Sequence, residues 1–284
     1  MVIGHFKRTP IAYAPEAVAN VINKYTEHRA YVFGIPPFGG IQPNTTIYHQ
    51  HNIDAVPYHP KLIQYHSEPF RVDLNVNIPQ LVIAQYQATL PEYKNCIIVR
   101  NPVDLFELKF LPKYNCDKIR IGYSPSTVNK TSEWADKGYV ETIPILKKLK
   151  REYKDLIDID VIINTPFEEC LYRKSLCNVF IDEVKTASYH RSGLESLAMG
   201  QLTICSVSPE VEVVMLEASG ANALPFVNVH HTYLYETLVG IIEQGMDSIL
   251  ARGFASRRWM EKYWSPSTIA EEYVQIYENI INKS

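Results

Sequence analysis

One segment in the second half of the chain combines residue types that suit a phosphate and a ribose. It spans residues 190–200 and reads HRSGLESLAMG. Ser192 and Gly193 stand where a helix is expected to begin, and a helix N-terminus attracts anions through its backbone N–H groups and its dipole. Gly193 also lets a ligand approach the backbone closely. Glu195, in the first turn, either stabilises the helix dipole or accepts hydrogen bonds from the two hydroxyls of a ribose.

A second segment places small polar residues and a lysine after an expected strand. Residues 122–126 read GYSPS, and Lys130 follows four positions later. Hydroxyl and amide groups in such a loop can hold phosphate oxygens, and the lysine ammonium can neutralise their charge. The same pattern also suits an ordinary surface turn, so it points to a diphosphate only together with the segment 190–200.

Histidines follow several expected strands of the first half. His66 ends one of them, and Glu68 comes two residues later. His49 and His51 are two positions apart, so a strand running on through them would place both on one face. The sequence shows no third ligand nearby, and we therefore expect no metal at this pair.

The first expected strand is followed by a loop that carries His5, Lys7 and Arg8. This basic loop is either a plain exposed turn or a part of a ligand-binding surface.

Regular elements must position these residues, and short apolar runs that alternate with helical patterns predict them. In the first half we expect strands at residues 1–3, 30–33, 45–48, 62–65 and 96–99, and helices from residue 10 and at 80–87. In the second half we expect strands at residues 119–123, 159–163, 178–181, 202–205 and 223–227, and helices at 139–153, 166–175, 192–199, 232–244 and 265–282. This alternation is typical of open parallel α/β sheets, which bind ligands at the carboxyl ends of their strands. The predicted fold is therefore two α/β domains with a cleft between them.

Composition narrows the class of protein. The 284 residues carry a net charge of −3, which does not mark a nucleic-acid binder. No apolar run approaches the ~20 residues of a membrane span, and the N-terminus lacks the apolar core of a signal peptide. The five cysteines are odd in number and scattered, which fits a reducing compartment and no structural zinc. We therefore expect a cytoplasmic protein, in which a peripheral contact with a membrane remains open.

The second half resembles the nucleotide-sugar-binding domain of the retaining glycosyltransferases of family 4, which have the GT-B fold. The segment 122–126 with Lys130, and the segment 192–204 (SGLESLAMGQLTI), match the motifs of that family in order. The turn 101–104 (NPVD) resembles its inter-domain turn, and the segment 264–277 resembles its last helix. The resemblance covers residues 95–282 well and the first 95 only by pattern.

The resemblance implies a fold and an activity. The fold is GT-B-like, with two Rossmann-type parallel-sheet domains that face a cleft and a reduced first domain. Residues 1–105 would form an acceptor-side domain, residues 106–262 the nucleotide-sugar-binding domain, and residues 263–284 a helix that packs back on the first domain. The activity would be transfer of a hexose, with UDP-glucose as a typical donor, to an acceptor hydroxyl with retention of configuration.

It also implies roles for individual residues. Lys130 would contact the donor diphosphate and Glu195 the ribose, with His66 near the donor sugar as the third catalytic residue. The other donor-binding residues would be Ser124, Ser126, Thr165, Arg191, Ser192, Gly193 and Leu194. Residues on the acceptor side would be His5, Lys7, Arg8, His51 and Glu68. No metal and no cofactor beyond the donor substrate would be needed, because cations and a helix N-terminus replace a divalent ion in this fold.

The sequence departs from the family at three points. Ala187 stands where the family commonly has a second glutamate, so that Asp182 or Glu183 would have to substitute. The arginine before the family lysine is missing, and Arg191 or Arg173 would have to replace its charge. The first domain is short for the fold, so we expect it to have lost strands.

Two questions stay open at this point. The acceptor could be a glycan, a lipid-linked sugar or a modified DNA base, and the basic residues 147–151, Arg257 and Arg258 permit the last. The chain could also be a non-catalytic nucleotide-sugar-binding protein, which the alanine at position 187 would favour. The sequence does not decide the oligomeric state.

Overall fold

The chain forms two compact α/β units in a computed structural model. The structure describes residues 1–284 except 9–12, 35–40, 67–76, 114–116, 127 and 129–136. Unit 1 consists of residues 1–104, 213–220 and 264–284, and unit 2 of residues 105–212 and 221–263.

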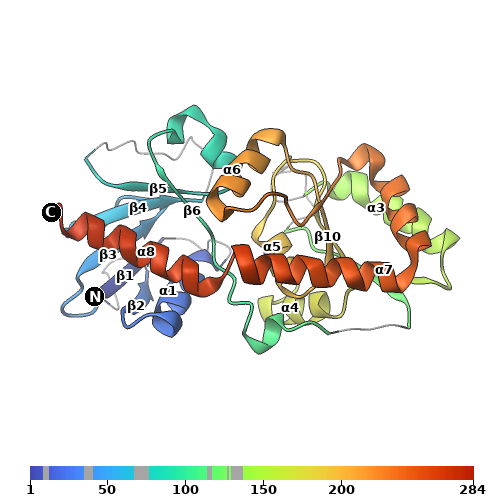
Figure 1. Cartoon of the computed structure of the whole chain (residues 1–284), viewed down its shortest axis with the longest axis horizontal. Helices are drawn as coiled ribbons and strands as arrows, with labels where there is room; N and C mark the ends of the chain where they lie inside the picture. Colours follow the sequence, from blue (N-terminus) through green and yellow to red (C-terminus); the bar gives the residue numbers. More distant parts are fainter. Residues whose placement is uncertain (9–12, 35–40, 67–76, 114–116, 127, 129–136) are drawn as a thin grey trace. The chain divides into compact units, whose positions relative to one another are not determined.

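Unit 1 is built on a six-stranded sheet in which all neighbouring strands are parallel. The strands are β1 (Val2–Lys7), β2 (Arg29–Phe33), β3 (Ile47–His51), β4 (Lys61–Tyr65), β5 (Gln80–Ile83) and β6 (Ile97–Val99). Their order across the sheet is β2-β1-β3-β4-β5-β6. This is a doubly wound order, in which the chain starts inside the sheet and builds outward in both directions. Two helices, α1 (Ala14–Tyr25) and α8 (Pro266–Ile281), pack against each other on this unit (Figure 1).

Three expectations for the first half are wrong. β1 does not end at Ile3 but runs to Lys7, which places His5 inside the sheet instead of in a loop. Residues 80–87 do not form a helix; they form β5 followed by a 3-10 turn, η2 (Tyr86–Thr89), which precedes a second one, η3 (Pro91–Tyr93). The unit has not lost strands, since six are present. Unit 1 fits six strands into a short sequence because some connections between strands are short. Nine residues, for example, join β3 to β4.

Unit 2 has a five-stranded parallel sheet in the order β11-β10-β9-β7-β8. The strands are β7 (Ile119–Tyr123), β8 (Ile157–Val161), β9 (Val179–Glu183), β10 (Leu202–Cys205) and β11 (Val227–Asn228). The helices are α3 (Tyr139–Glu152), α4 (Phe167–Ser175), α5 (Arg191–Ala198) and α7 (Leu234–Tyr263), with short 3-10 turns η4 (Leu108–Phe110) and η5 (His231–Tyr233). A further helix, α6 (Pro209–Ser219), has its residues from Val213 onward assigned to unit 1.

The core of unit 2 follows from the β-branched residues of its strands. Ile121 on β7, Val179 and Ile181 on β9 and Ile204 on β10 are fully buried, as expected for strands covered on both faces. α7 packs against α3, α5 and β10. Its backbone is non-helical at Gly245, one residue after the predicted end at residue 244, and a second helical segment continues from this kink to Tyr263.

None of the described helices combines the length and the apolar character that a bilayer crossing requires.

Candidate functional site

The residues with functional chemistry in unit 2 gather because its strands are parallel. The carboxyl ends of β7, β8, β9 and β10 all lie at the same edge of the sheet. Ser124 follows β7, Thr165 follows β8, and Asp182 and Glu183 end β9. The helix α5 begins eight residues after β9, so its N-terminus belongs to the loops at that edge.

A pocket of about 420 Å³ lies where β7 and β8 end. Three residues predicted to bind the donor line this pocket: Ser124, Ser126 and Thr165. Ser124 and Thr165 are 41 positions apart in the sequence. The other lining residues are Pro125, Ile162, Asn164, Pro166 and Cys170. Hydroxyl groups and the Asn164 side chain beside apolar residues suit a planar ring with polar edges, such as a nucleobase.

A buried charge cluster surrounds Glu195, which lies on α5. The Nζ of Lys174, on α4, is 2.7 Å from one carboxylate oxygen of Glu195, and the Nε of Arg191 is 3.2 Å from the other. Lys174 and Glu195 are only 1% and 4% exposed. Burial by itself would raise the pKa of Glu195, but the adjacent Lys174 and Arg191 lower it below its usual value. The carboxylate is therefore charged and held in place from both sides.

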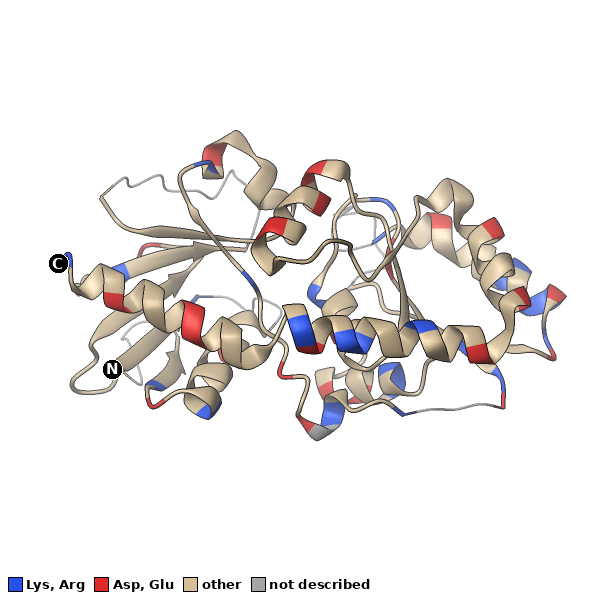
Figure 2. Ribbon diagram, viewed as in Figure 1, with Lys and Arg blue, Asp and Glu red and all other residues tan. Residues whose placement is uncertain are grey.

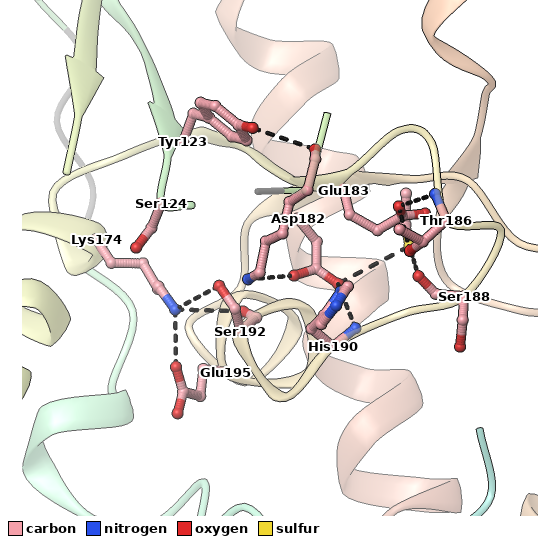
Figure 3. A network of polar contacts seen from close by, with 12 residues as sticks. Tyr123, Ser124, Lys174, Asp182, Glu183, Thr186, Ser188, His190, Ser192 and Glu195 are labelled. Carbon is pink, nitrogen blue, oxygen red and sulfur yellow. Dashed lines mark hydrogen bonds and ion pairs between the residues drawn. The ribbon is translucent and has the colours of Figure 1, made fainter. Parts of the chain in front are cut away.

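Ser192 joins this cluster through its side chain. Its hydroxyl accepts a hydrogen bond of 3.0 Å from Lys174 Nζ, as Figure 3 shows. The amides of Gly193 and Leu194 donate to the carbonyl of His190, at 3.0 and 3.4 Å. Two of the three backbone amides that were predicted to meet a phosphate are thus engaged within the first turn of α5.

Asp182 forms a second buried ion pair beside the first turn of α5. One of its oxygens accepts a 2.6 Å hydrogen bond from the amide of His190 (Figure 3), and the other lies 3.5 Å from Lys137 Nζ. Burial raises the pKa of Asp182, although Lys137 acts in the opposite direction. A Cβ atom on Gly193 would come within 2.6 Å of this carboxylate. Packing against Asp182 therefore explains the glycine at position 193 as well as close approach of a ligand would.

Glu183 points into the protein and is also fully buried. One of its oxygens accepts hydrogen bonds from the amides of Lys185 and Thr186 and from the Thr186 hydroxyl, at 3.0, 2.5 and 2.6 Å. Its other oxygen has no partner among the described residues. Burial raises the pKa of Glu183 to about 7. Since Asp182 and Glu183 both serve internal contacts, neither side chain is presented to a sugar in place of the acid missing at Ala187.

The remaining predicted residues are those outside the described part of the chain and those of unit 1. Lys130 and Glu68 lie outside the described residues. In unit 1, His5 and His51 are buried in the sheet, whereas Lys7 pairs with Glu16 and Arg8 is exposed. His66 is half-buried at the end of β4, with its Nε2 2.9 Å from Nδ1 of His51.

Sequence reasoning missed the two buried lysines. Lys174 was part of an expected helix, where a lysine is usually solvent-exposed. Its spacing carried a signal, because Leu171, Lys174 and Ser175 follow the i, i+3, i+4 pattern of a buried helix face and all three are buried. Arg173, one candidate for the missing family arginine, pairs with Asp160 instead. Lys137 gave no comparable signal.

Comparisons with known proteins show the fold. Neither a protein-family model nor a curated protein matches the sequence. Among solved structures, a glycosyltransferase from Rickettsia africae matches with a TM-score of 0.64 and 13% identity, over 100% of this chain and 99% of that one. HepE from Anabaena, solved with UDP-glucose, matches with a TM-score of 0.63 and 11% identity, over 98% and 100% of the two chains. Sucrose-phosphate synthase from Thermosynechococcus elongatus matches with a TM-score of 0.59 and 11% identity, over the full length of both.

The likeness extends over the whole chain and confirms the predicted fold class. Both sheets are parallel, and the solved structures with this arrangement are GT-B glycosyltransferases. At 11–13% identity the likeness establishes the fold alone. This chain is thus an α/β protein of two parallel-sheet units, with a GT-B-like fold.

Proposed function

We propose that this protein is a glycosyltransferase that takes a hexose from a nucleotide-diphosphate sugar. The observation that carries the proposal is the edge of the unit 2 sheet. There the pocket of Ser124, Ser126 and Thr165 lies in loops that follow parallel strands, and the charge cluster around Glu195 lies on the helices α4 and α5. HepE, which has the same fold, was solved with UDP-glucose, and this supports UDP-glucose as the first donor to test.

Each part of the donor has a proposed partner. The base enters the pocket between the ends of β7 and β8, where Thr165 and Ser124 offer hydroxyl groups. The ribose hydroxyls bind Glu195, whose charged carboxylate is a good acceptor. Lys130, Arg191 and the N-terminus of α5 neutralise the diphosphate.

The charges of the cluster support binding of an anion without a metal. Lys174 and Arg191 contribute two positive charges against the single negative charge of Glu195, which leaves one positive charge. The positive end of the α5 dipole adds to it. Such preorganised positive charge stabilises a leaving diphosphate in the way a divalent ion does elsewhere. We therefore expect turnover without an added cofactor.

Retention of configuration follows from the family resemblance and is part of the proposal. In that mechanism the leaving diphosphate oxygens help to deprotonate the acceptor, so the protein mainly positions charges. His66 of unit 1 is the proposed contact to the donor sugar, and His5, Lys7, Arg8, His51 and Glu68 were the residues expected on the acceptor side. Because His5 and His51 are buried, neither can touch an acceptor directly in this conformation, whereas Arg8 is exposed.

The proposed acceptor is a glycan or a lipid-linked sugar, in the cytoplasm or at the membrane surface. The DNA alternative has lost part of its support. Arg257 is buried, donates to the backbone carbonyls of Phe110 and Ala198 and pairs with Glu261. Figure 2 shows Lys and Arg residues on the ribbons of α3 and α7 among acidic ones. Arg257 therefore stabilises the interior of unit 2 and does not face a ligand at the surface.

Donor binding and turnover test the proposal. The purified chain should bind UDP and release it from one of a panel of nucleotide sugars when an acceptor is supplied. Glu195→Gln and Lys130→Ala should each weaken donor binding at least tenfold, whereas Lys150→Ala, on an exposed position of α3, should leave it unchanged. A chain that binds no nucleoside diphosphate at all would refute the proposal.

One observation favours a non-catalytic nucleotide-sugar-binding protein. No acid stands at position 187, and Asp182 and Glu183 are buried. A single-turnover experiment with bound, labelled donor separates the two functions. Transfer or slow hydrolysis of the sugar indicates an enzyme, whereas donor that stays intact on a chain with normal UDP affinity indicates a binding protein.

A further inference from the structure

Unit 1 contains a row of histidines within its sheet. His5 lies on β1 and is in register with His49 on β3, and His51 comes two residues further along β3. Because side chains alternate along a strand, all three rings point to the same face. They are 0%, 0% and 1% exposed. Polar rings are rarely grouped in a core in this way, and such a group needs partners.

Some nitrogen atoms of these rings have hydrogen-bond partners and others do not. His5 Nδ1 lies 3.1 Å from His51 Nε2, and His51 Nδ1 lies 2.9 Å from His66 Nε2. On the other side, His49 Nδ1 lies 2.8 Å from the hydroxyl of Tyr277, on α8. The Nε2 atoms of His5 and His49 are buried and have no hydrogen-bond partner among the described residues.

The two unpartnered nitrogens call for a ligand. A buried polar atom without a partner destabilises a protein by roughly 1–3 kcal/mol. A neutral imidazole has one N–H and one lone pair. Lone pairs on neutral imidazoles are what transition-metal ions bind.

We propose that His5, His49 and His51 together bind one divalent transition-metal ion, with Zn²⁺ as the first candidate. One nitrogen from each ring lies within 4.8 Å of the other two. In a tetrahedral site with Zn–N bonds of 2.0–2.1 Å, ligand nitrogens are about 3.3 Å apart. The most distant pair must therefore close by about 1.5 Å at most.

The surroundings have the features of a metal site. Metal-binding histidines are usually oriented by a hydrogen bond from their second nitrogen, and Tyr277 can do this for His49 and His66 for His51. Three imidazoles favour zinc, copper or nickel over magnesium or calcium, which prefer oxygen. Lys7 is the cation next to His51 across the strands, and its charge is balanced by its ion pair with Glu16.

The three ligands of this site belong to unit 1, apart from the pocket and the α5 cluster of unit 2. Of the proposed donor-site residues that the structure describes, only His66, the proposed contact to the donor sugar, adjoins it, through His51. The ion would connect β1 to β3, and through Tyr277 it would hold α8 against the sheet. We therefore assign the ion to stabilising unit 1, and we expect the proposed sugar transfer to need no metal. The sequence analysis expected no metal at His49 and His51 because the third ligand, His5, is 44 residues away and was assigned to a loop.

The test uses the full chain without a histidine tag. Protein stripped with a chelator is titrated with Co²⁺ and with Zn²⁺, and bound metal is measured by mass spectrometry. We expect one ion per chain, an intense visible spectrum typical of tetrahedral Co²⁺, and a rise in thermal stability with Zn²⁺. His49→Gln should lose the ion and the spectrum.

Two further variants keep the outcome clear. The rings of His230 and His231 lie 4.0 Å apart near the surface of unit 2 and could bind metal by themselves, so the double variant His230→Gln/His231→Gln should retain the site in unit 1. His51→Cys keeps a metal ligand and should add a thiolate-to-cobalt absorption band that the wild type, with its own five cysteines, does not show. The proposal is overturned if the stripped chain takes up no ion, or if only the His230/His231 variant loses it.

Discussion

At the scale of single residues, the site in unit 2 is organised by Lys174, a residue that the sequence does not single out. Its ammonium contacts the Glu195 carboxylate and the Ser192 hydroxyl, and it lies 4.8 Å from the centre of the Phe180 ring. A buried charge with several partners is held rigidly, which suits a group that must place a carboxylate for a ligand. Lys174 is thus a positioning residue for Glu195.

Removing Lys174 should therefore harm more than donor binding. Lys174→Met leaves Glu195 with Arg191 alone, and breaking a buried ion pair from one side costs about 3 kcal/mol of unfolding free energy. Lys174→Met/Glu195→Gln should recover part of that loss, because no carboxylate is then left short of a partner. Denaturant unfolding of the four members of this cycle measures the coupling. Additive losses would show that the pair does not interact.

A second prediction at this scale concerns Glu183 and pH. Its pKa is about 7 in the folded protein, against the ordinary value of 4.5 that applies to the unfolded chain. The folded state therefore holds the proton more tightly, and stability is full below pH 4.5 and falls as the pH rises through 7. The loss is about 3 kcal/mol over this range.

Glu183→Gln imitates the protonated form and should remove this decline, so that the variant is more stable than the wild type at pH 8. Glu243→Gln, at an exposed position of α7, should follow the wild type. Chemical unfolding at pH 5, 6, 7 and 8 gives the slopes. Parallel curves for the wild type and Glu183→Gln would contradict the assignment.

At the scale of elements, the close packing of α7 depends on a glycine. A Cβ atom on Gly253 would lie 2.1 Å from the carbonyl oxygen of Gly200, in the turn between α5 and β10. That turn follows the helix that carries Glu195. Gly200 ends this helix, and its φ of 71° places it in the left-handed conformation that favours glycine.

We expect Gly253→Ala to lower the stability of unit 2 by about 1–3 kcal/mol, because a methyl group at this position must push two backbones apart. Gly240 also belongs to α7, before the kink at Gly245, and no atom lies within 4 Å of a Cβ added there. Gly240→Ala should therefore raise stability by up to about 1 kcal/mol. Thermal unfolding of both variants measures the difference. If Gly253→Ala proves as stable as Gly240→Ala, α7 can shift without loss and the close contact is not a constraint.

Helices and strands with a strong local pattern of apolar residues were predictable from the sequence. Elements whose length depends on the neighbouring strands were not. The apolar run of β9 and the helix predicted at residues 265–282, which is α8, are confirmed, because local spacing alone decides them. β1 was predicted too short since His5 and Lys7 look like loop residues, whereas the neighbouring strands β2 and β3 extend it. β5 was taken for a helix because four residues are too few to show a period.

At the scale of the whole molecule, the same limit applies to the candidate sites. Ser124, Ser126 and Thr165 could be predicted together because parallel strands bring their ends to one edge. Lys174 and the row of histidines could not, because their meaning depends on partners far away in the sequence, such as Glu195 for the lysine and Tyr277 for His49. The roles of the predicted residues stay predictions until a ligand is bound.

The two proposed ligands should act on different units, and this can be observed in one experiment. A ligand raises the stability of the native state to which it binds by RT ln(1 + [L]/Kd), or about 2.7 kcal/mol at one hundred times Kd. In hydrogen exchange followed by mass spectrometry, UDP should protect most strongly the peptides of β9 and α5, and Zn²⁺ those of β1 and β3. Glu195→Gln should abolish only the first effect and His49→Gln only the second. If instead UDP gives its strongest protection in β1 and β3, the donor site has been placed in the wrong unit, whatever the overall affinity.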